Sequence, residues 1–572
     1  MVKSFPISNT EELFQQKWED FEPCYIELQQ AQLQEKTIHE WLAQWTQASE
    51  WCDEFYNRAY VAVTTNTADE LAESRFKDYM EGFYPFWQSA EQQLKEKLLK
   101  SGLQPEGMQV PLRNMRAEAD LFRPENLPLQ AEEEQLNNEH DKVIGAQSVI
   151  WQGGQCTARQ MEVVLRDKER ETRRAGWELL SQRQLQDREA INDHWQRYMH
   201  LRAQLAANAQ KTDYRAYVWQ RYKRFDYTPG DCKLFQRAIE EVVVPAVARL
   251  DEGRRQALGV ESLRYYDLFV DPSDALPLTP FTDISQLKAG ASAIFQHVHP
   301  TFGAYFDQMD AESLLDLENR INKANGGYCT NFAHSRRPFI FANAVGIHDD
   351  VQTLLHEGGH AFHAFESTRL PYFQQSQEGS LPTEFCEVAS MGMEFLSMPY
   401  LGQEFGGYYS APDAARARME KLANDLRFWP YMAIVDAFQH WAYENPEQGS
   451  QPEKCDQKWA ELESCFRPGI DWNGYEDVMM TGWQRKDHIH QMPFYYVEYG
   501  LALLGAAQIW RNSLSDQAAA VGQYQQALAL GGTETLPALF HTAGARLAFD
   551  RSTLKDAVDL IIQEIGAIAN RP

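Results

Sequence analysis

Apolar side chains recur at helical spacing along most of this 572-residue chain. Over residues 10–105, Leu, Ala, Trp and Phe stand three or four positions apart among Glu, Gln and Lys, which is the pattern of helices that bury one face. Residues 29–50 and 68–100 are predicted to form long amphipathic helices. Helical spacing returns over 133–225 and 413–445, so we expect a mainly α fold.

Strand-like composition is rare, and the clearest example is R-P-F-I-F-A-N-A-V at residues 337–345. It follows a turn, Asn325-Gly326-Gly327-Tyr328. Such a strand could offer its edge to an extended peptide, a common way of holding peptide backbone. A short structural hairpin that closes the domain is an equally good interpretation. Either way, we expect a small β element just before the segment that carries the candidate chemistry.

The charge pattern limits the possible partners. There are 82 acidic and 54 basic residues, a net charge of −28, so no excess of Lys and Arg is available to neutralise nucleic-acid phosphate. The dense charges of residues 166–174 (R-D-K-E-R-E-T-R-R) alternate in sign, which is typical of a solvated helix face rather than a binding patch.

Targeting and redox signals are also informative. No apolar run approaches the length of a membrane span, and the first residues lack the apolar core of a signal peptide. The eight cysteines include no C-x-x-C pair and are expected to be reduced thiols. We therefore expect a cytoplasmic protein with neither nucleic-acid nor membrane partners.

Residues 351–366 contain the strongest chemical motif, H-E-G-G-H. His356 and His360 are four positions apart, so on a helix both imidazoles lie on one face and can bind one zinc ion. Glu357 would lie beside the metal, where it can take a proton from an acidified water. Gly358 and Gly359 each cost about 1 kcal/mol in a helix interior. We interpret them as a place where something approaches the helix backbone closely.

A catalytic zinc site needs a third protein ligand. Glu384, Glu387 and Glu394 occupy positions i, i+3 and i+10 of one predicted helix and can share a face. Spacing does not choose among them, and the two that do not bind metal would suit contacts to the ligand imidazoles. His363 stands where the pattern H-E-x-x-H-x-x-G-x-x-H requires glycine, so that class of zinc protease is excluded and His363 is interpreted as a packed or supporting histidine.

A second candidate lies at residues 488–500, where two histidines precede three closely spaced tyrosines. Tyr495 and Tyr496 are four and three positions before Tyr499, so several hydroxyl groups can face one cleft. A phenol or imidazolium aimed at a developing oxyanion contributes roughly 3–4 kcal/mol to catalysis. An aromatic stripe in the core is the alternative, and the histidines just upstream favour a catalytic role.

These motifs resemble the M3 family of zinc oligopeptidases, the thimet oligopeptidase and oligoendopeptidase F group, and most closely its bacterial oligoendopeptidase F and Pz-peptidase branch. The resemblance covers most of the chain. It is carried by L-L-H-E-G-G-H-A-F-H at the metal motif and E-F-C-E-V-A-S at 384–390, and by Trp151–Gly154, Arg224–Pro229, Gly531-Gly532 and His541–Gly544.

The resemblance implies His356, His360 and Glu387 as ligands of one zinc ion and Glu357 as general base. It leaves Glu384 and Glu394 beside the ligands. It further implies the oxyanion-stabilising residues His488, Tyr496 and Tyr499. Apart from the resemblance, we predict that Gly326, Gly327, Tyr328 and Tyr495 bind substrate. The chain departs from the mammalian pattern at Met492 and Pro493, where that pattern has Gly-Tyr.

The family fold is an almost wholly helical shell in two lobes around a deep substrate channel. We expect a helical N-terminal region at 1–130, a helical oligoendopeptidase F-like lobe at 131–230 and a catalytic region at 231–572. The expected activity is zinc-dependent hydrolysis of internal bonds in short unstructured peptides. The alternatives are a peptidyl-dipeptidase, with Arg336, Arg337 or Arg485 holding a terminal carboxylate, and a catalytically dead peptide-binding scaffold. The sequence leaves the oligomeric state open.

Overall fold

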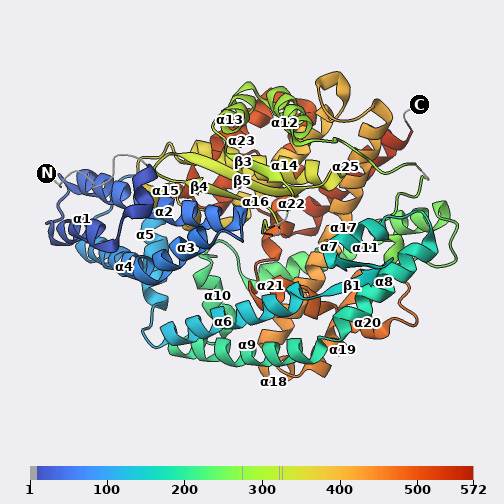
Figure 1. Ribbon diagram of the computed structural model, residues 1–572, viewed down its shortest axis with the longest axis horizontal. Coiled ribbons are helices and arrows are strands. Elements are labelled where there is room, and N and C mark those ends of the chain that lie inside the picture. The colour runs from blue at the N-terminus through green and yellow to red at the C-terminus, as the bar shows by residue number, and fades with distance from the viewer. Residues whose placement is uncertain (1–9, 274, 321, 325, 571–572) are drawn as a thin grey trace. The chain divides into compact units, whose positions relative to one another are not determined.

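The computed structural model describes residues 10–570 except 274, 321 and 325, so Asn325 of the predicted turn lies outside the described residues. Helices dominate the described chain, which confirms the expected mainly α fold (Figure 1). Contacts divide the chain into two compact units, each assembled from three separate segments. The contiguous regions 1–130, 131–230 and 231–572 and the substrate channel stay predictions.

The first unit comprises residues 1–119, 278–418 and 502–547. Its main elements are α1 (Trp18–Gln30), α2 (Ile38–Thr65), α3 (Glu70–Gly82), α4 (Tyr84–Ser101), α5 (Gln109–Leu121), α12 (Ile284–Val298), α13 (Pro300–Ala311), β3 (Leu315–Glu318), β4 (Tyr328–Phe332), β5 (Arg337–Ala344), α14 (His348–Ser367), α15 (Phe373–Ser376), α16 (Thr383–Ser397), α23 (Gln517–Leu528) and α24 (Leu536–Thr542). Two further helices, α17 (Ala411–Glu444) and α22 (Val497–Ser515), contribute residues to both units, as does α5 with its last two residues.

The second unit comprises residues 120–277, 419–501 and 548–572. Its other elements are α6 (Asn126–Gly145), β1 (Ser148–Trp151), β2 (Gly154–Thr157), α7 (Ala158–Leu165), α8 (Arg170–Leu185), α9 (Arg188–Asn208), α10 (Tyr214–Arg221), α11 (Pro229–Ala257), α18 (Pro446–Gly449), α19 (Pro452–Phe466), α20 (Glu476–Met480), α21 (Asp487–His490) and α25 (Arg551–Ala569). None of the described helices combines the length and the apolar character needed to cross a bilayer.

The two long N-terminal helices predicted from periodicity are each interrupted. Within 29–50, α1 ends and α2 begins only at Ile38, and the Trp41 indole donates to the Leu28 carbonyl at 3.0 Å, so α2 folds back on α1. Within 68–100, α3 and α4 are separated at Phe83, because Pro85 in the first turn of α4 has no N–H to continue a helix. The predicted helical character was right and the predicted continuity was wrong.

The strand predicted at 337–345 is β5, and it lies in the middle of a three-stranded sheet ordered β3-β5-β4. It pairs with β3 in parallel and with β4 antiparallel. The prediction that this strand offers its own edge to a peptide is therefore wrong, since both of its edges are already paired. The sheet packs beside α14, the helix that carries the H-E-x-x-H motif (Figure 1).

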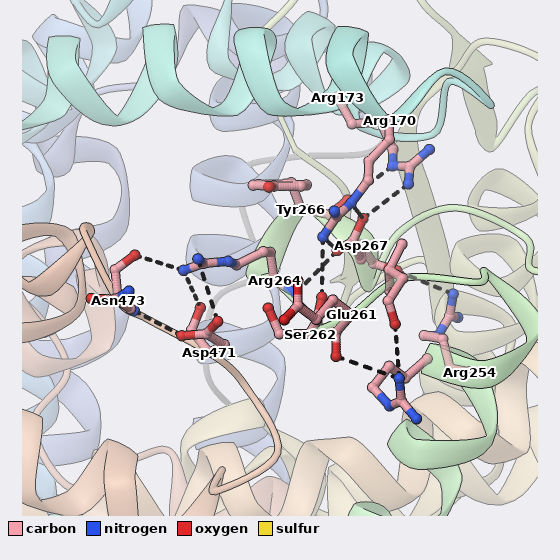
Figure 2. Close-up of polar contacts among 12 residues, drawn as sticks. Arg170, Arg173, Arg254, Glu261, Ser262, Arg264, Tyr266, Asp267, Asp471 and Asn473 are labelled. Atoms are coloured by element: carbon pink, nitrogen blue, oxygen red, sulfur yellow. Dashed lines mark hydrogen bonds and ion pairs between the residues drawn. The ribbon is translucent and has the colours of Figure 1, made fainter.

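The charged run at 166–174 is in part the solvated face that its alternating charges predict, since Asp167, Lys168, Glu169 and Glu171 are exposed, but two of its arginines point inward. Arg170 and Arg173, at the start of α8, both bind the carboxylate of Asp267, which has no exposed surface (Figure 2). Arg173 itself is 2% exposed. Burial alone would raise the pKa of Asp267, but hydrogen bonds from Arg170, the Arg264 backbone and Arg173 outweigh burial and lower it. These arginines stabilise the core of the second unit.

Candidate metal centre

The helices that carry the predicted ligands, α14 and α16, pack with their backbones in close contact. A Cβ atom on Gly359 would lie 2.5 Å from the Ala389 carbonyl oxygen and 2.6 Å from Ser390 Cα. A Cβ atom on Gly358 would lie 2.5 Å from the Phe295 ring. Side chains cannot be accommodated at such distances, so the interpretation of both glycines as points of close approach is confirmed. This packing brings α16 against the histidine face of α14.

His356, His360 and Glu387 converge with their donor atoms facing one another. The Nε2 atoms of His356 and His360 lie 3.4 and 3.7 Å from the same Glu387 oxygen, Oε2. Ligand atoms bound to a tetrahedral zinc at about 2.0–2.2 Å are separated by about 3.3–3.6 Å. All three donor atoms lie within 4.8 Å of one another. Their chemistry and spacing therefore fit a single bound zinc ion.

Two further side chains orient these ligands. His356 Nδ1 lies 2.7 Å from Glu394 Oε1, so the imidazole donates from Nδ1, and its Nε2 faces Glu387. Ser390 donates its hydroxyl to Glu387 Oε2 at 3.0 Å. Carboxylates that accept the second N–H of a metal-binding imidazole are the usual outer support of such sites. Glu394 occupies that position.

The charged side chains of the centre favour the binding of a cation. Burial alone would lower the pKa of His356, but hydrogen bonds with Glu387 and Glu394 outweigh burial and raise it well above its ordinary value. Burial alone would raise the pKa of Glu387, yet the hydrogen bond with His356 and the charges of the two imidazoles lower it to about 2. The carboxylates that stabilise an imidazolium ion here would equally stabilise a metal cation.

Glu357 follows His356 on α14 and is 8% exposed. Its carboxylate makes no hydrogen bond or ion pair with any of the residues that the structure describes. Glu384 is buried in the first turn of α16, 3% exposed. His363 is also buried, with its ring centroid 5.9 Å from that of Phe385, and it is not among the three converging donors. Burial, with a smaller effect of His360, lowers the pKa of His363 to about 3, so this imidazole is neutral at pH 7.

The predicted aromatic residues of the second unit form one cluster, here called the His–Tyr cluster: His488, Tyr495, Tyr496 and Tyr499. The His488 ring centroid lies 5.9, 5.1 and 5.9 Å from those of Tyr495, Tyr496 and Tyr499. Burial raises the pKa of Tyr496 well above its ordinary value, so this phenol keeps its proton at neutral pH. Lys486 lies over the Tyr496 ring, with Nζ 4.2 Å from the centroid. The cluster joins the short helix α21 to the start of α22.

The predicted substrate-binding turn lies next to α14. Gly326 has φ +93°, a conformation that glycine adopts readily, and its carbonyl accepts from the Asn343 side chain at 2.9 Å. A Cβ atom on Gly327 would lie 3.5 Å from Cγ2 of Thr353 on α14. The Tyr328 hydroxyl shares a 2.6 Å hydrogen bond with Thr64, so the phenol is turned toward α2. The backbone of this turn, rather than the Tyr328 hydroxyl, is thus available beside α14.

A second group of metal-type donors, missed from the sequence, is buried in the second unit: Cys232, Asp436 and His440. Arg215 Nη1 lies 3.3 Å from His440 Nδ1, and a guanidinium can only donate. With Nδ1 accepting this hydrogen bond, the imidazole carries a proton on Nε2, which removes the lone pair a metal would need there. The i, i+4 spacing of Asp436 and His440 on α17 is visible in the sequence, whereas Cys232 comes from the distant α11.

In a comparison with known protein families, the one described as Peptidase family M3 matches residues 163–558 of this chain. The chain belongs to Peptidase family M3. This membership agrees with the resemblance carried by the two ligand motifs, and it covers α14, α16 and the His–Tyr cluster. The family match therefore includes every residue of the candidate metal centre.

Individual known proteins are similar to this chain in sequence and in fold. Oligoendopeptidase F, chromosomal, from Lactococcus lactis subsp. cremoris is 28% identical over 149 residues, and the aligned segment spans 26% of this chain and 23% of that protein. The alignment thus covers about a quarter of the length of this curated relative. The solved structure of Pz peptidase A with an inhibitor has a TM-score of 0.86 and 25% identity, covering 99% of this chain and 98% of that one. Oligoendopeptidase-F from Enterococcus faecium, at 14% identity and TM-score 0.60 over 96% and 98% of the two chains, shares the fold.

Proposed function

We propose that this M3 protein is a zinc-dependent oligoendopeptidase that hydrolyses internal bonds of short, unstructured peptides. The observation that carries the proposal is the convergence of His356 Nε2, His360 Nε2 and Glu387 Oε2 at separations suited to one tetrahedral ion. Three protein ligands leave a fourth position open, which is typical of catalytic rather than structural zinc sites.

In this proposal His356, His360 and Glu387 hold one zinc ion, and Glu394 fixes the orientation of His356. The chemistry that zinc supplies when bound is acidification of water and polarisation of a carbonyl group. Glu357 accepts the proton of the attacking water. Its carboxylate is suited to this because it makes no hydrogen bond or ion pair with any other residue that the structure describes. Glu384 is buried on the same helix as the ligand Glu387, and we assign it a supporting role beside the ligands.

The His–Tyr cluster is assigned to the oxyanion that develops as water attacks the peptide carbonyl. Tyr496 and Tyr499 supply phenolic donors, and His488 supplies an imidazole donor. Retention of the Tyr496 proton, caused by burial, supports this role because only a protonated phenol can donate. Preorganised donors of this kind act at the moment of reaction without reorganising.

Substrate contacts are assigned to Gly326, Gly327, Tyr328 and Tyr495. The exposed glycines beside α14 support this, because they leave room for a peptide backbone to approach. Short peptides are the proposed partners, nucleic acid and membrane are not, and the cytoplasmic location stays a prediction.

The peptidyl-dipeptidase alternative needs a cation that is available for a terminal carboxylate. Arg337 is paired with Glu312 at 2.7 Å, and Arg485 donates to the Val478 carbonyl at 2.6 Å and to the Thr481 hydroxyl at 3.1 Å. Of the three candidate arginines, these two therefore have partners, which favours the endopeptidase. The dead-scaffold alternative is disfavoured by Glu357, since a binding module has no need of a general base beside its ligands.

The test is cleavage of a quenched fluorescent peptide of about ten residues, with products identified by mass spectrometry and zinc measured by elemental analysis. We expect internal cuts by the wild type, loss with a chelator and recovery on adding zinc. Glu357→Gln should keep its zinc and lose about 10²–10⁴-fold in kcat, as for removal of a general base. His363→Gln, a histidine of the same helix outside the donor set, is the matched control and should keep both zinc and activity. Cleavage by Glu357→Gln at the wild-type rate would overturn the proposal.

A further inference from the structure

The turn that leads into the His–Tyr cluster has a strained backbone at Phe494. This residue lies between α21 and α22 and has φ +68°, in the left-handed region that bulky side chains rarely adopt. Such conformations cost on the order of 1–3 kcal/mol and persist only where surrounding contacts impose them. Tyr495 and Tyr496 follow directly, so the conformation of Phe494 sets the direction in which the tyrosines leave the turn.

Two side chains from distant parts of the second unit hold this turn. Arg224 Nη2 donates to the Phe494 carbonyl at 2.7 Å, across 270 residues of sequence. The Phe494 N–H donates to Gln439 Oε1 on α17 at 2.7 Å. Both backbone polar groups of the strained residue are therefore bound by side chains of other elements rather than by a neighbouring helix turn.

The same Arg224 nitrogen also binds the first turn of α22, since it lies 2.5 Å from Glu498 Oε1. The Arg224 side chain is fully buried and that of Glu498 is 1% exposed. The guanidinium lies over the rings of Trp219 and Tyr222, at 4.7 and 5.0 Å from their centroids. If either partner of this buried ion pair is removed, the other charge is left unpaired and away from water, which is unfavourable. Arg224 thus links the turn at Phe494 to the residue that immediately precedes Tyr499.

We propose that Arg224, together with Glu498 and Gln439, is a positioning residue that sets the placement of the His–Tyr cluster for catalysis. The inference rests on the proposed oxyanion role of that cluster. Arg224 acts by holding Phe494 and Glu498. Tyr495 and Tyr496 lie between these two residues in the chain, and Tyr499 follows Glu498. The two hydrogens of one guanidinium nitrogen are held in a fixed plane, so Arg224 Nη2 can serve both acceptors with fixed geometry, whereas the donors of a lysine ammonium rotate on a flexible stem.

The test compares Arg224→Lys with a matched control, Arg173→Lys. Arg173 is likewise buried in the second unit against a buried carboxylate, Asp267, but lies in the network at the start of α8 (Figure 2). We expect Arg224→Lys to lower kcat by about 10–100-fold with KM changed less than about threefold, because misplacement of catalytic groups by about 1 Å costs about 100-fold. Amide hydrogen exchange should rise within residues 487–499. Arg173→Lys should leave kcat and exchange of that segment unchanged.

A purely structural ion pair would lower thermal stability in both variants without a selective loss of kcat, and that result would overturn the proposal. Unchanged exchange at 487–499 in Arg224→Lys would overturn it as well. If the proposed oxyanion role is wrong, Tyr496→Phe and Tyr499→Phe keep the wild-type kcat. The exchange measurement does not depend on activity, so it tests the positioning role of Arg224 separately. If Arg224→Lys does not fold, Gln439→Met removes the acceptor of the Phe494 N–H, together with the hydrogen bond from Gln439 Nε2 to the Val435 carbonyl of the same helix. It must then raise exchange at 487–499 and lower kcat, or the proposal fails.

Discussion

The metal centre and the His–Tyr cluster are supported in opposite ways. The centre is built on two helices that contact each other along their backbones, and its supporting carboxylate, Glu394, is only 38 residues from the His356 that it orients. The cluster is built on a strained turn, and the side chain that holds it, Arg224, is 270 residues from Phe494. Rigid helices fix the first site locally, whereas long-range hydrogen bonds fix the second.

This contrast teaches where each site is vulnerable. Under the proposed function, changes at the candidate metal centre act through the donor atoms themselves, because the close α14–α16 packing leaves the predicted ligands little freedom to move. Changes to the cluster can act from a distance, because the turn has no regular backbone hydrogen bonding of its own at Phe494. The predictions below test this difference, starting from the largest expected effect.

The largest effect is expected at a ligand. Glu387→Ala removes one of three donors and should leave the protein folded but without zinc at stoichiometric concentration. Peptide hydrolysis should fall by about 10³-fold or more, because several kcal/mol of charge stabilisation are lost. Elemental analysis and kcat measurement check this. A variant with full zinc and wild-type turnover would show that Glu387 is not a ligand.

The next effect is expected within the cluster. Tyr496→Phe and Tyr499→Phe each remove one hydroxyl group while keeping the aromatic packing. Removal of one oxyanion donor lowers kcat by about 10²–10³-fold, so the residue that donates should show this loss with zinc content unchanged. Steady-state kinetics with a fluorescent peptide measure it. If neither variant loses kcat, the cluster is a packing element and the comparison between two catalytic regions does not hold.

A smaller effect, on stability, tests the close packing of the metal helices. Gly359→Ala would place a methyl group 2.5 Å from the Ala389 carbonyl oxygen, and overpacking of this kind costs about 1–3 kcal/mol. Gly253→Ala on α11, where a Cβ atom meets nothing within 4 Å, is the control and should stabilise by up to about 1 kcal/mol through helix propensity. Denaturant unfolding measures both. Equal changes in unfolding free energy for the two variants would mean that α14 and α16 can move apart to accommodate the methyl group at little cost.

The smallest effect concerns pH and the second unit. Burial, followed by the charges of His140 and Arg202, lowers the pKa of His490 well below its ordinary value. The unfolded chain therefore binds a proton at about pH 6.5 that the folded chain does not, so unfolding free energy falls as the pH drops below about 6.5. The slope is at most about 1.4 kcal/mol per pH unit for this group. His490→Gln should flatten the fall in melting temperature between pH 7 and 5, and an unchanged profile would contradict this assignment.

Much of the candidate site could be predicted because its parts lie close together in sequence. The motif at 356–360 and the glutamates of α16 share two helices, so helical periodicity alone puts each set on one face. The arginines at 166–174 show the limit. Alternating charge is typical of a solvated face, yet Arg173 is buried because Asp267, 94 residues away, is there to bind it.

The sequence by itself determined that the fold is mainly helical, that two histidines and a glutamate could share one metal, and that something approaches the helix backbone closely at two glycines. These are properties of spacing and of single residues. The tertiary structure alone decided that β5 is an inner strand, that Glu394 orients His356, and that Arg224 and Gln439 bind the turn at Phe494. Each of these three features depends on which distant part of the chain a side chain or strand edge contacts, and the local sequence does not specify that partner.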